Sequence, residues 1–213
     1  MKWIKQLFAV ALLTASMVPA CAQVGVKTNL AGWATTTTNV GMEVGLSKHS
    51  TFQVMGYLNP WNFANGRHFR FWTAQPEYRY YWSCGKYNGH FVGVHALGGE
   101  YNAKKLNFPL KALVWGDAYD RNPNFAAADH EGGWPDLTGE NSGRHVEGWY
   151  IGAGVSYGYQ WILSKHWNFE GSVGVGYVYS PMKYYGRCKQ CINKHRLNYV
   201  GPTNAQLSLI YIF

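Results

Sequence analysis

Two interleaved sets of residues run through Glu147–Ser164, which reads EGWYIGAGVSYGYQWILS. Every second position from Trp149 to Trp161 is aromatic or aliphatic, whereas the positions between them are mostly glycine or small polar residues. Such a period of two is typical of a β-strand with two unlike faces. The whole chain has 17% aromatic and only 14% charged residues, with 25 glycines, a composition that suits a β-protein exposed to something other than water.

The same alternation recurs along the chain, although the third of the segments that carry it is the least regular. The segments are about 24–33, 40–47, 51–59, 69–82, 90–101, 148–163, 167–179 and 203–213. Eight short strands in sequence, separated by turn and loop residues, predict an all-β fold with an antiparallel up-and-down sheet closed into a barrel.

Alternation alone does not say which face points inward, because a soluble barrel of the lipocalin type would bury the apolar set. Trp149 and Trp161 lie twelve positions apart on one face. With a rise of about 3.3 Å per residue and a tilt near 40°, they are separated by roughly 30 Å along a membrane normal, close to the ~25 Å apolar band of outer-membrane barrels. We therefore expect a transmembrane barrel whose aromatic girdle includes Trp72, Trp82, Trp149, Trp161, Tyr177 and Tyr179.

The connections and the C-terminus favour the same interpretation. Short connections alternate with longer ones, of which 102–147 is the longest and 180–202 another, as expected for tight periplasmic turns and long extracellular loops. The chain ends in LSLIYIF, with apolar or aromatic side chains at Leu209, Tyr211 and Phe213. This ending resembles the signal that the outer-membrane insertion machinery reads.

Residues 1–22 predict a cleavable signal peptide. Lys2 and Lys5 precede an apolar run, and Ala20-Cys21-Ala22 suits signal peptidase; lipidation at Cys21 is the alternative. Residues 23–213 then form the exported barrel domain, without a later apolar run of the roughly 18 residues that a membrane helix needs. Removing the two lysines leaves 17 basic against 11 acidic side chains, a net charge of +6 that is too mild to indicate nucleic-acid binding.

Several stretches also resemble a known family: TNLAGWATTTTNVGMEVGL, QPEYRYYW, EGWYIGAGVSYGYQWILSKHWNFE with the following GSVGVGY, and GPTNAQLSLIYIF. They are similar to an uncharacterised family of outer-membrane barrels from Bacteroidota, a domain of unknown function. The resemblance implies an outer-membrane location and frequent encoding beside fimbrial assembly genes, and it implies no known enzyme activity. The segment 113–142 is longer than in this family, so a role for it cannot be carried over.

The inward-facing set contains six ionisable residues on five strands. A proton path, a gate or a catalytic pair of carboxylates would use such residues, but the favoured interpretation is a lumenal ion-pair network, since charges in a barrel filled by side chains must be paired. The consequence is a plugged barrel rather than a pore. The residues are Lys27, Glu43, Glu77, Arg79, His95 and Glu170.

Two further groups of residues could carry chemistry. An enzyme acting on lipid A or another surface lipid would need a Ser or His near the outer leaflet, for which His68, His145 and Ser142 are the candidates. Cys188 and Cys191, with His195 four residues on, predict either a disulfide between the two cysteines or a metal site that lacks an evident fourth ligand. Cys84 is expected to stay free, because it lies at the opposite end of the barrel.

The long loop and the segment that follows strand 167–179 have opposite charge. Residues 117–140 carry a net charge of −5, and residues 180–202 a net charge of +5. We expect the acidic loop to fold over the barrel mouth against the basic segment, with Trp115, Phe125 and Trp134 adding apolar contact; a mobile acidic loop beside a basic segment that binds lipopolysaccharide is the alternative.

Taken together, the sequence predicts an outer-membrane barrel that is a structural or binding component of the cell surface, accessory to fimbrial or adhesin assembly, without a cofactor. Its expected partners are outer-membrane lipid and lipopolysaccharide, the barrel insertion machinery, and fimbrial or other surface proteins. A small outer-membrane enzyme is the alternative.

Overall fold

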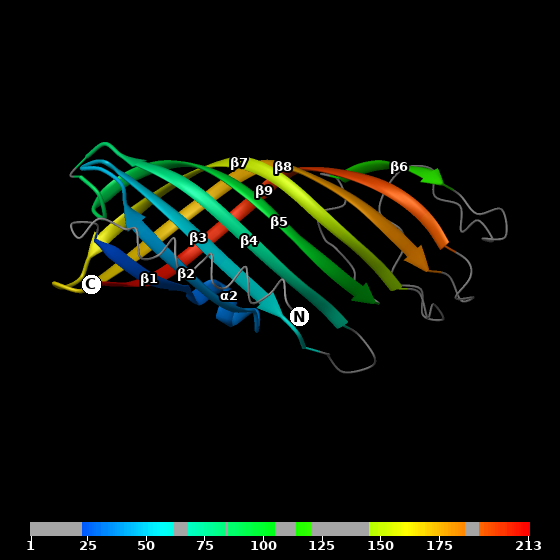
Figure 1. Ribbon diagram of the computed structural model, residues 1–213, viewed down its shortest axis with the longest axis horizontal. Helices are drawn as coiled ribbons and strands as arrows, with labels where there is room; N and C mark the ends of the chain where they lie inside the picture. Colours follow the sequence, from blue (N-terminus) through cyan, green and yellow to red (C-terminus); the bar gives the residue numbers. More distant parts are fainter. Residues whose placement is uncertain (1–22, 62–67, 84, 105–113, 121–144, 186–191) are drawn as a thin grey trace, which may run out of the picture.

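The computed structural model describes residues 23–61, 68–83, 85–104, 114–120, 145–185 and 192–213. Most of these residues are in strands, and one short helix lies between the first two strands (Figure 1). In chain order the elements are β1 (Val24–Asn29), α2 (Leu30–Ala34), β2 (Thr38–Gly45), β3 (Ser50–Asn59), β4 (His68–Tyr81), β5 (Gly89–Lys104), β6 (Val114–Asp120), β7 (His145–Ile162), β8 (Trp167–Tyr185) and β9 (Ile192–Ile212).

Eight of these strands form a closed ring. Each pairs antiparallel with its neighbours in the order β1-β2-β3-β4-β5-β7-β8-β9, and β9 pairs back to β1 from Gly25 opposite Ile212 to Asn29 opposite Ser208. The least regular segment, 51–59, is β3 and pairs along its whole length with β4. The predicted eight-stranded, antiparallel, up-and-down barrel is confirmed.

The two ends of the barrel differ. The connections between β2 and β3, β4 and β5, and β7 and β8 lie at the end that also holds the C-terminus, at the left of Figure 1, which we call the turn end. There the amide of Phe213 donates to the carbonyl of Val24 at 2.9 Å, and the turns are closed by bonds such as that from the Leu163 amide to the Trp167 carbonyl at 2.9 Å. The opposite end, where β1 connects to β2, β3 to β4, and β8 to β9, we call the loop end.

At the loop end the wall is uneven in height. β4, β5, β7, β8 and β9 extend well beyond β1, β2 and β3 (Figure 1). The expectation of loops over 102–147 and 180–202 was therefore wrong in part: β8 and β9 stay paired up to Tyr185 opposite Ile192, and β5 with β7 up to Lys104 opposite His145. These extensions lack regular apolar alternation. They form strands nevertheless, because pairing uses the hydrogen bonds of the backbone, which do not depend on the side chains.

A ninth strand lies within the predicted long loop. β6 pairs antiparallel with the upper part of β9, with Asp117 opposite Arg196 and Asp120 opposite Lys194. The beginning of the acidic segment, up to Asp120, is thus an extension of the sheet beside the basic segment. The remaining residues of the expected lid, including Phe125 and Trp134, lie outside the described residues.

The strand β1 ends earlier than the segment 24–33 predicted, and Asn29 explains how. Its side-chain oxygen accepts from the amide of Ala31 at 3.1 Å, capping α2, and from the amide of Leu207 at 3.1 Å. Its side-chain nitrogen donates to the carbonyl of Ala205 at 3.1 Å. The amide group therefore continues the ladder along β9 for one step after the backbone of β1 has turned away.

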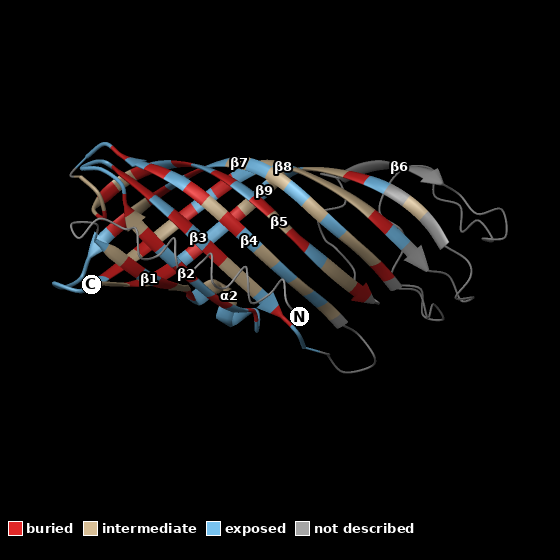
Figure 2. Cartoon of the chain, viewed as in Figure 1, coloured by how far each residue is buried: buried red, intermediate tan, exposed pale blue. Residues whose placement is uncertain are grey.

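The distribution of polar and apolar side chains is the opposite of that in an ordinary globular protein: many polar side chains are buried and many apolar ones are exposed. Along most of the described length of the eight ring strands, buried residues alternate with exposed or intermediate ones (Figure 2). Most of the buried positions in the half nearer the turn end are polar or charged, whereas exposed positions include Val94, Val155 and Val173 at 63%, 57% and 65% exposure. A smaller set of buried apolar side chains lies toward the loop end, namely Leu97, Ala103, Val146, Met182 and Leu197.

Candidate functional site

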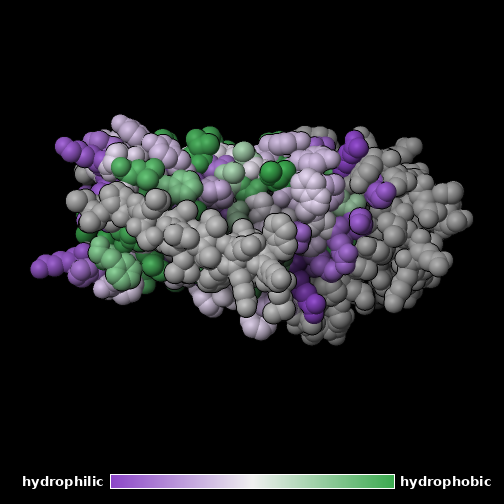
Figure 3. All heavy atoms as spheres, viewed as in Figure 1, coloured by the Kyte–Doolittle hydropathy of each residue, from purple (hydrophilic) through white to green (hydrophobic). Residues whose placement is uncertain are grey.

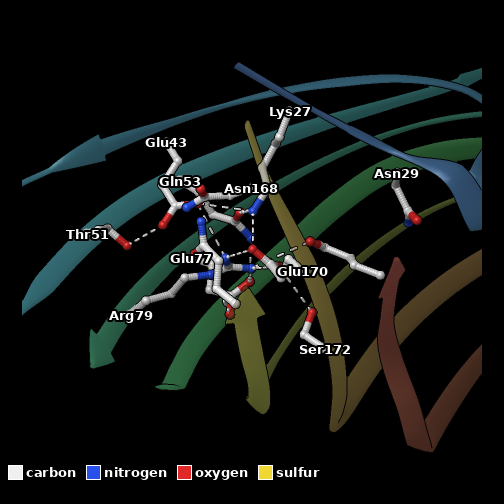
Figure 4. Close-up of polar contacts among 12 residues, drawn as sticks. Lys27, Asn29, Glu43, Thr51, Gln53, Glu77, Arg79, Asn168, Glu170 and Ser172 are labelled. Atoms are coloured by element: carbon white, nitrogen blue, oxygen red, sulfur yellow. Dashed lines mark hydrogen bonds and ion pairs between the residues drawn. The ribbon is translucent and has the colours of Figure 1, made fainter. Parts of the chain in front are cut away.

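A cluster of charged side chains fills the middle of the barrel (Figure 4). Lys27 of β1 donates to Glu43 of β2 at 3.1 Å and to Glu170 of β8 at 2.7 Å, and also to the side-chain oxygen of Gln53 of β3 at 2.6 Å. One ammonium group therefore ties together three strands besides its own. It has all three of its donor positions occupied, which suits a lysine held entirely away from water.

Arg79 of β4 is the second cation of the cluster. Its two terminal nitrogens donate to the two carboxylate oxygens of Glu170 at 2.7 and 2.9 Å, and one of them also reaches Glu43 at 3.4 Å. The guanidinium lies 3.3 Å from Glu77 and stacks on the ring of Phe91 at 4.4 Å. A planar fork with five donors can meet three carboxylates at once, a geometry that lysine cannot copy.

Neutral side chains complete the hydrogen bonding of the carboxylates. Glu43 accepts from Thr51 at 2.7 Å and from the hydroxyl of Tyr81 at 3.0 Å. Glu77 accepts from the side-chain nitrogen of Gln53 at 2.7 Å and from the hydroxyl of Ser156. No carboxylate in the cluster depends on an ion pair alone.

The chemistry of this cluster is that of a structural plug. The side chains of Lys27, Glu43, Glu77, Arg79 and Glu170 are fully buried, three acids against two bases. Buried charges are stable only when paired and hydrogen-bonded, and removal of one partner is strongly destabilising. The acids are all engaged by cations or hydroxyl donors, so none is placed as a free general base.

The sixth predicted member, His95 of β5, lies on the inner face but apart from the ion pairs. Its Nε2 is 2.8 Å from the hydroxyl of Thr203, and within the described part of the chain it makes no ion pair. Gly154 and Gly174 flank its ring, where a side chain would have met it. The structure thus brings together five of the six predicted residues.

Sequence reasoning missed the uncharged members of the cluster, which are Thr51, Gln53, Tyr81, Ser156 and Gln160. For four of them the signal was present as parity: Thr51, Gln53 and Gln160 face a predicted charge in the neighbouring strand, and Tyr81 shares the inner face of β4 with Arg79. Ser156 faces only glycines, Gly93 and Gly174, in its neighbouring strands. Polarity alone did not single them out, since hydroxyls and amides are equally common on exposed faces.

The predicted aromatic residues all lie on the outer face, at two levels. Near the loop end, Trp72 donates to Glu100 at 3.2 Å and Trp149 makes an edge contact with Tyr179 at 6.1 Å. Tyr177 donates to Asn198 at 2.5 Å. Near the turn end lie two more predicted tryptophans, each beside another ring: Trp82 beside His90, and Trp161 beside Phe169.

The residues of the predicted insertion signal end β9 at the turn end. Tyr211 packs edge-on against Trp167 and Phe213, with ring centroids 5.1 and 4.9 Å apart. Leu209 is the backbone partner of Thr28 and Phe169 in the sheet. Leu209 and Tyr211 therefore belong to the strand that closes the ring, and Phe213 follows it directly, bonded to β1 through its amide.

The cysteines considered for a disulfide or a metal site, Cys84, Cys188 and Cys191, lie outside the described residues. So does Ser142, a candidate for the lipid-enzyme alternative. His195 is a backbone member of β9, opposite Met182 and Ala118, and His68 and His145 begin β4 and β7. In the described part of the chain, no group of three or more His, Cys, Asp or Glu side chains is arranged to hold a metal ion.

Among residues 23–61 and the other described ranges, no helix is long and apolar enough to span a membrane.

The sequence was compared with known families, curated proteins and solved structures. A family model described as "Protein of unknown function (DUF3575)" matches residues 7–213. The chain belongs to this family. No curated protein and no solved structure matches it. Membership agrees with the resemblance found in the sequence, and carries no assigned activity with it.

Proposed function

We propose that this protein is an outer-membrane barrel with a closed interior, acting at the cell surface as a structural or binding component. Lipid and lipopolysaccharide surround its wall, the barrel insertion machinery assembles it, and fimbrial or adhesin subunits are the partners proposed for its outward end. The alternative of an enzyme acting on lipid A has no specific support among the described residues.

The observation that carries this proposal is the inversion of polarity between the two faces. Burying Lys27, Glu43 and Glu170 while exposing a belt of valine, leucine and tryptophan would be unstable in water, because soluble monomers seldom expose large continuous apolar surface. Figure 3 shows hydrophobic side chains over the left half of the wall, with hydrophilic ones at the left end and right of centre. Hydrocarbon around the belt removes the conflict.

The ion cluster supports a closed interior. The largest fully buried side chains include Arg79, Tyr81, Lys27 and Phe91, all directed inward at the same level. An eight-stranded barrel has an interior just wide enough for such side chains. Ion flow would require the whole cluster to break, so we infer that the protein does not serve as a general diffusion pore.

The loop end supports a binding role. The strands β8, β9 and β6 extend beyond the other strands and place Asp117 and Asp120 opposite Arg196 and Lys194 in the sheet. Connections on a rigid barrel are free to specialise in recognition. We therefore assign surface interactions to this end.

The location is tested by expressing the chain with its own N-terminus in its natural host and separating inner from outer membranes. The protein should be recovered with the outer membrane and should change mobility on gels when heated, as folded barrels do. Recovery in the soluble periplasmic fraction would contradict the proposal. Reconstituted vesicles should show no ion flux above background, with a general porin as the positive control.

The partner is tested by crosslinking intact cells and purifying the barrel in detergent. Fimbrial or adhesin subunits should be crosslinked to the wild-type barrel and lost when residues 121–144 are replaced by a short glycine-serine linker. If the replacement leaves the crosslinked partners unchanged while the barrel is still folded, the loop end is not the binding surface.

A further inference from the structure

A second interior feature lies between the ion cluster and the loop end. It is a cavity of about 410 Å³, bounded by α2 on one side and by the inner faces of β3, β4, β5, β7 and β9. This volume falls in the range of roughly 300 to 1,000 Å³ that is typical of small-molecule sites. Thr35, at the rim of the cavity beside α2, is exposed.

Two buried amides in the wall of this cavity have unpartnered nitrogens. Gln75 of β4 and Asn204 of β9 are 4% and 6% exposed, and their side-chain nitrogens have no hydrogen-bond partner. A buried polar group without a partner destabilises the fold, so such groups in native proteins call for an explanation. Both amides border the same cavity, so a single polar ligand there would partner both.

A bulge in β9 presents one of these amides. Gly174 faces Asn204 and Val175 faces Pro202, so Thr203 is an extra residue in β9. Thr203 and Asn204 both border the cavity, and the hydroxyl of Thr203 is held by His95 at 2.8 Å. Bulges re-aim side chains and are frequent beside binding sites.

Aromatic rings supply the other walls. Tyr57, Phe71 and Tyr150 line the cavity, and the hydroxyl of Tyr150 makes a short contact with Thr73. None of the described residues that line it carries a charge, although the ion cluster begins only two positions away on β4, at Glu77. An anionic or cationic ligand would therefore lack a counter-charge.

We propose that this cavity binds a neutral saccharide. A sugar ring offers hydroxyl oxygens to the amides of Gln75 and Asn204, and its apolar faces pack against aromatic rings. A purely apolar ligand would leave both amides unpaired, at the same cost as before. This inference deepens the proposed binding role and rests on it for access from the cell surface.

Binding is tested on the barrel folded in detergent, where membrane location plays no part. The probes are methyl glucoside, methyl galactoside, methyl mannoside and N-acetylglucosamine, observed by saturation-transfer NMR and titrated for affinity. At least one should bind the wild type, with saturation transferred from aromatic protons. Absence of binding by all four would overturn the inference.

Variants locate the site. Gln75→Leu and Asn204→Leu should each weaken binding about tenfold or more, the loss expected when one hydrogen-bonding group is removed. Gln206→Leu is the matched control, because it is a buried amide on β9 that does not line the cavity. Folding of every variant is checked by heat-dependent gel mobility, and Tyr150→Phe, which removes one hydroxyl, serves if a leucine variant does not fold.

The outcomes separate this inference from the proposed function. Unchanged affinity in every folded cavity variant would place the saccharide elsewhere and overturn the site. A protein that fractionates with the outer membrane but binds no saccharide would remove the ligand and leave the barrel proposal intact. A protein that binds saccharide through Gln75 but is soluble in the periplasm would overturn the outer-membrane proposal and leave the saccharide site intact.

Discussion

Arg79 and Glu170, 91 positions apart in the chain, meet inside the barrel through two parallel hydrogen bonds of 2.7 and 2.9 Å. β5 and β7 lie between their strands on one side of the ring, and β9, β1, β2 and β3 on the other. The pair therefore braces two walls that share no backbone hydrogen bond. Both side chains are fully buried, so solvent does not weaken the contact.

Replacing Arg79 with lysine should be costly although the charge is kept. An ammonium group cannot make the two-pronged contact with Glu170 and also reach Glu77, so we expect Arg79→Lys to lower the free energy of unfolding by about 1.5 to 3 kcal/mol. Denaturant titration in one detergent measures the loss. Arg70→Lys, on the exposed outer face, should cost less than about 1 kcal/mol. Equal losses for both variants would show that the bidentate geometry contributes nothing.

Lys27→Met should destabilise the barrel more strongly, by about 3 to 5 kcal/mol, because it leaves buried carboxylates without their partner. Lys48→Met, the same change at an exposed turn position, should be nearly neutral. Adding Glu43→Gln to Lys27→Met restores the charge balance of the cluster, so the double variant should unfold at higher denaturant than the Lys27→Met single. A double variant that is less stable than the single would contradict the ion-pair account.

The side chain of Asn29 should protect the edge of β9 from hydrogen exchange. Asn29→Ala removes the acceptor of the Leu207 amide and should speed exchange there, whereas Asn29→Asp keeps that acceptor and loses the side-chain nitrogen that donates to Ala205 and Tyr57. Exchange followed by NMR at the Leu207 amide should rank alanine fastest, then aspartate, then wild type. Asn198→Ala, on the outer face of the same strand, should leave this amide unchanged; identical rates in all variants would refute the capping role.

Gly154 is required by close packing between β7 and β8. A Cβ there would clash with the carbonyl of Val175 and lie 2.8 Å from His95, so Gly154→Ala should cost about 1 to 3 kcal/mol. Gly98→Ala is the matched control, since its Cβ would have only an ordinary contact of 3.7 Å. The difference in unfolding free energy between the two variants measures the effect, and a harmless Gly154→Ala would mean that the strands can separate there.

Val155 lies midway between Trp149 and Trp161 on the outer wall, and it tests the membrane proposal directly. In lipid vesicles Val155→Arg should cost about 2 to 4 kcal/mol, whereas Leu163→Arg, in the turn beyond Trp161, should cost about 0 to 1 kcal/mol. Folding yield and denaturant midpoint report both. Equal tolerance of arginine at the two sites would mean that hydrocarbon does not surround this wall.

The local part of this architecture could be predicted from the alternation of residues. The period of two marks the strands and assigns each side chain to a face, which is why Lys27, Glu43 and Glu77 were expected on the inside and Trp149 and Trp161 on the outside. The extensions of β8 and β9 and the strand β6 were missed because they have no regular apolar alternation. Pairing of backbone groups produces strands there without that pattern.

The amino-acid sequence by itself determined the eight strands of the ring, which face of each strand points inward and the supply of inward charges, because these depend only on neighbouring positions along the chain. Only the tertiary structure decided that Lys27 meets Glu170, 143 positions away, that Asn29 continues the ladder of β9, and that Gln75 and Asn204 border one cavity. The physical reason is register. Ring closure between β1 and β9 determines which inward side chains share a level, and no local pattern encodes that closure.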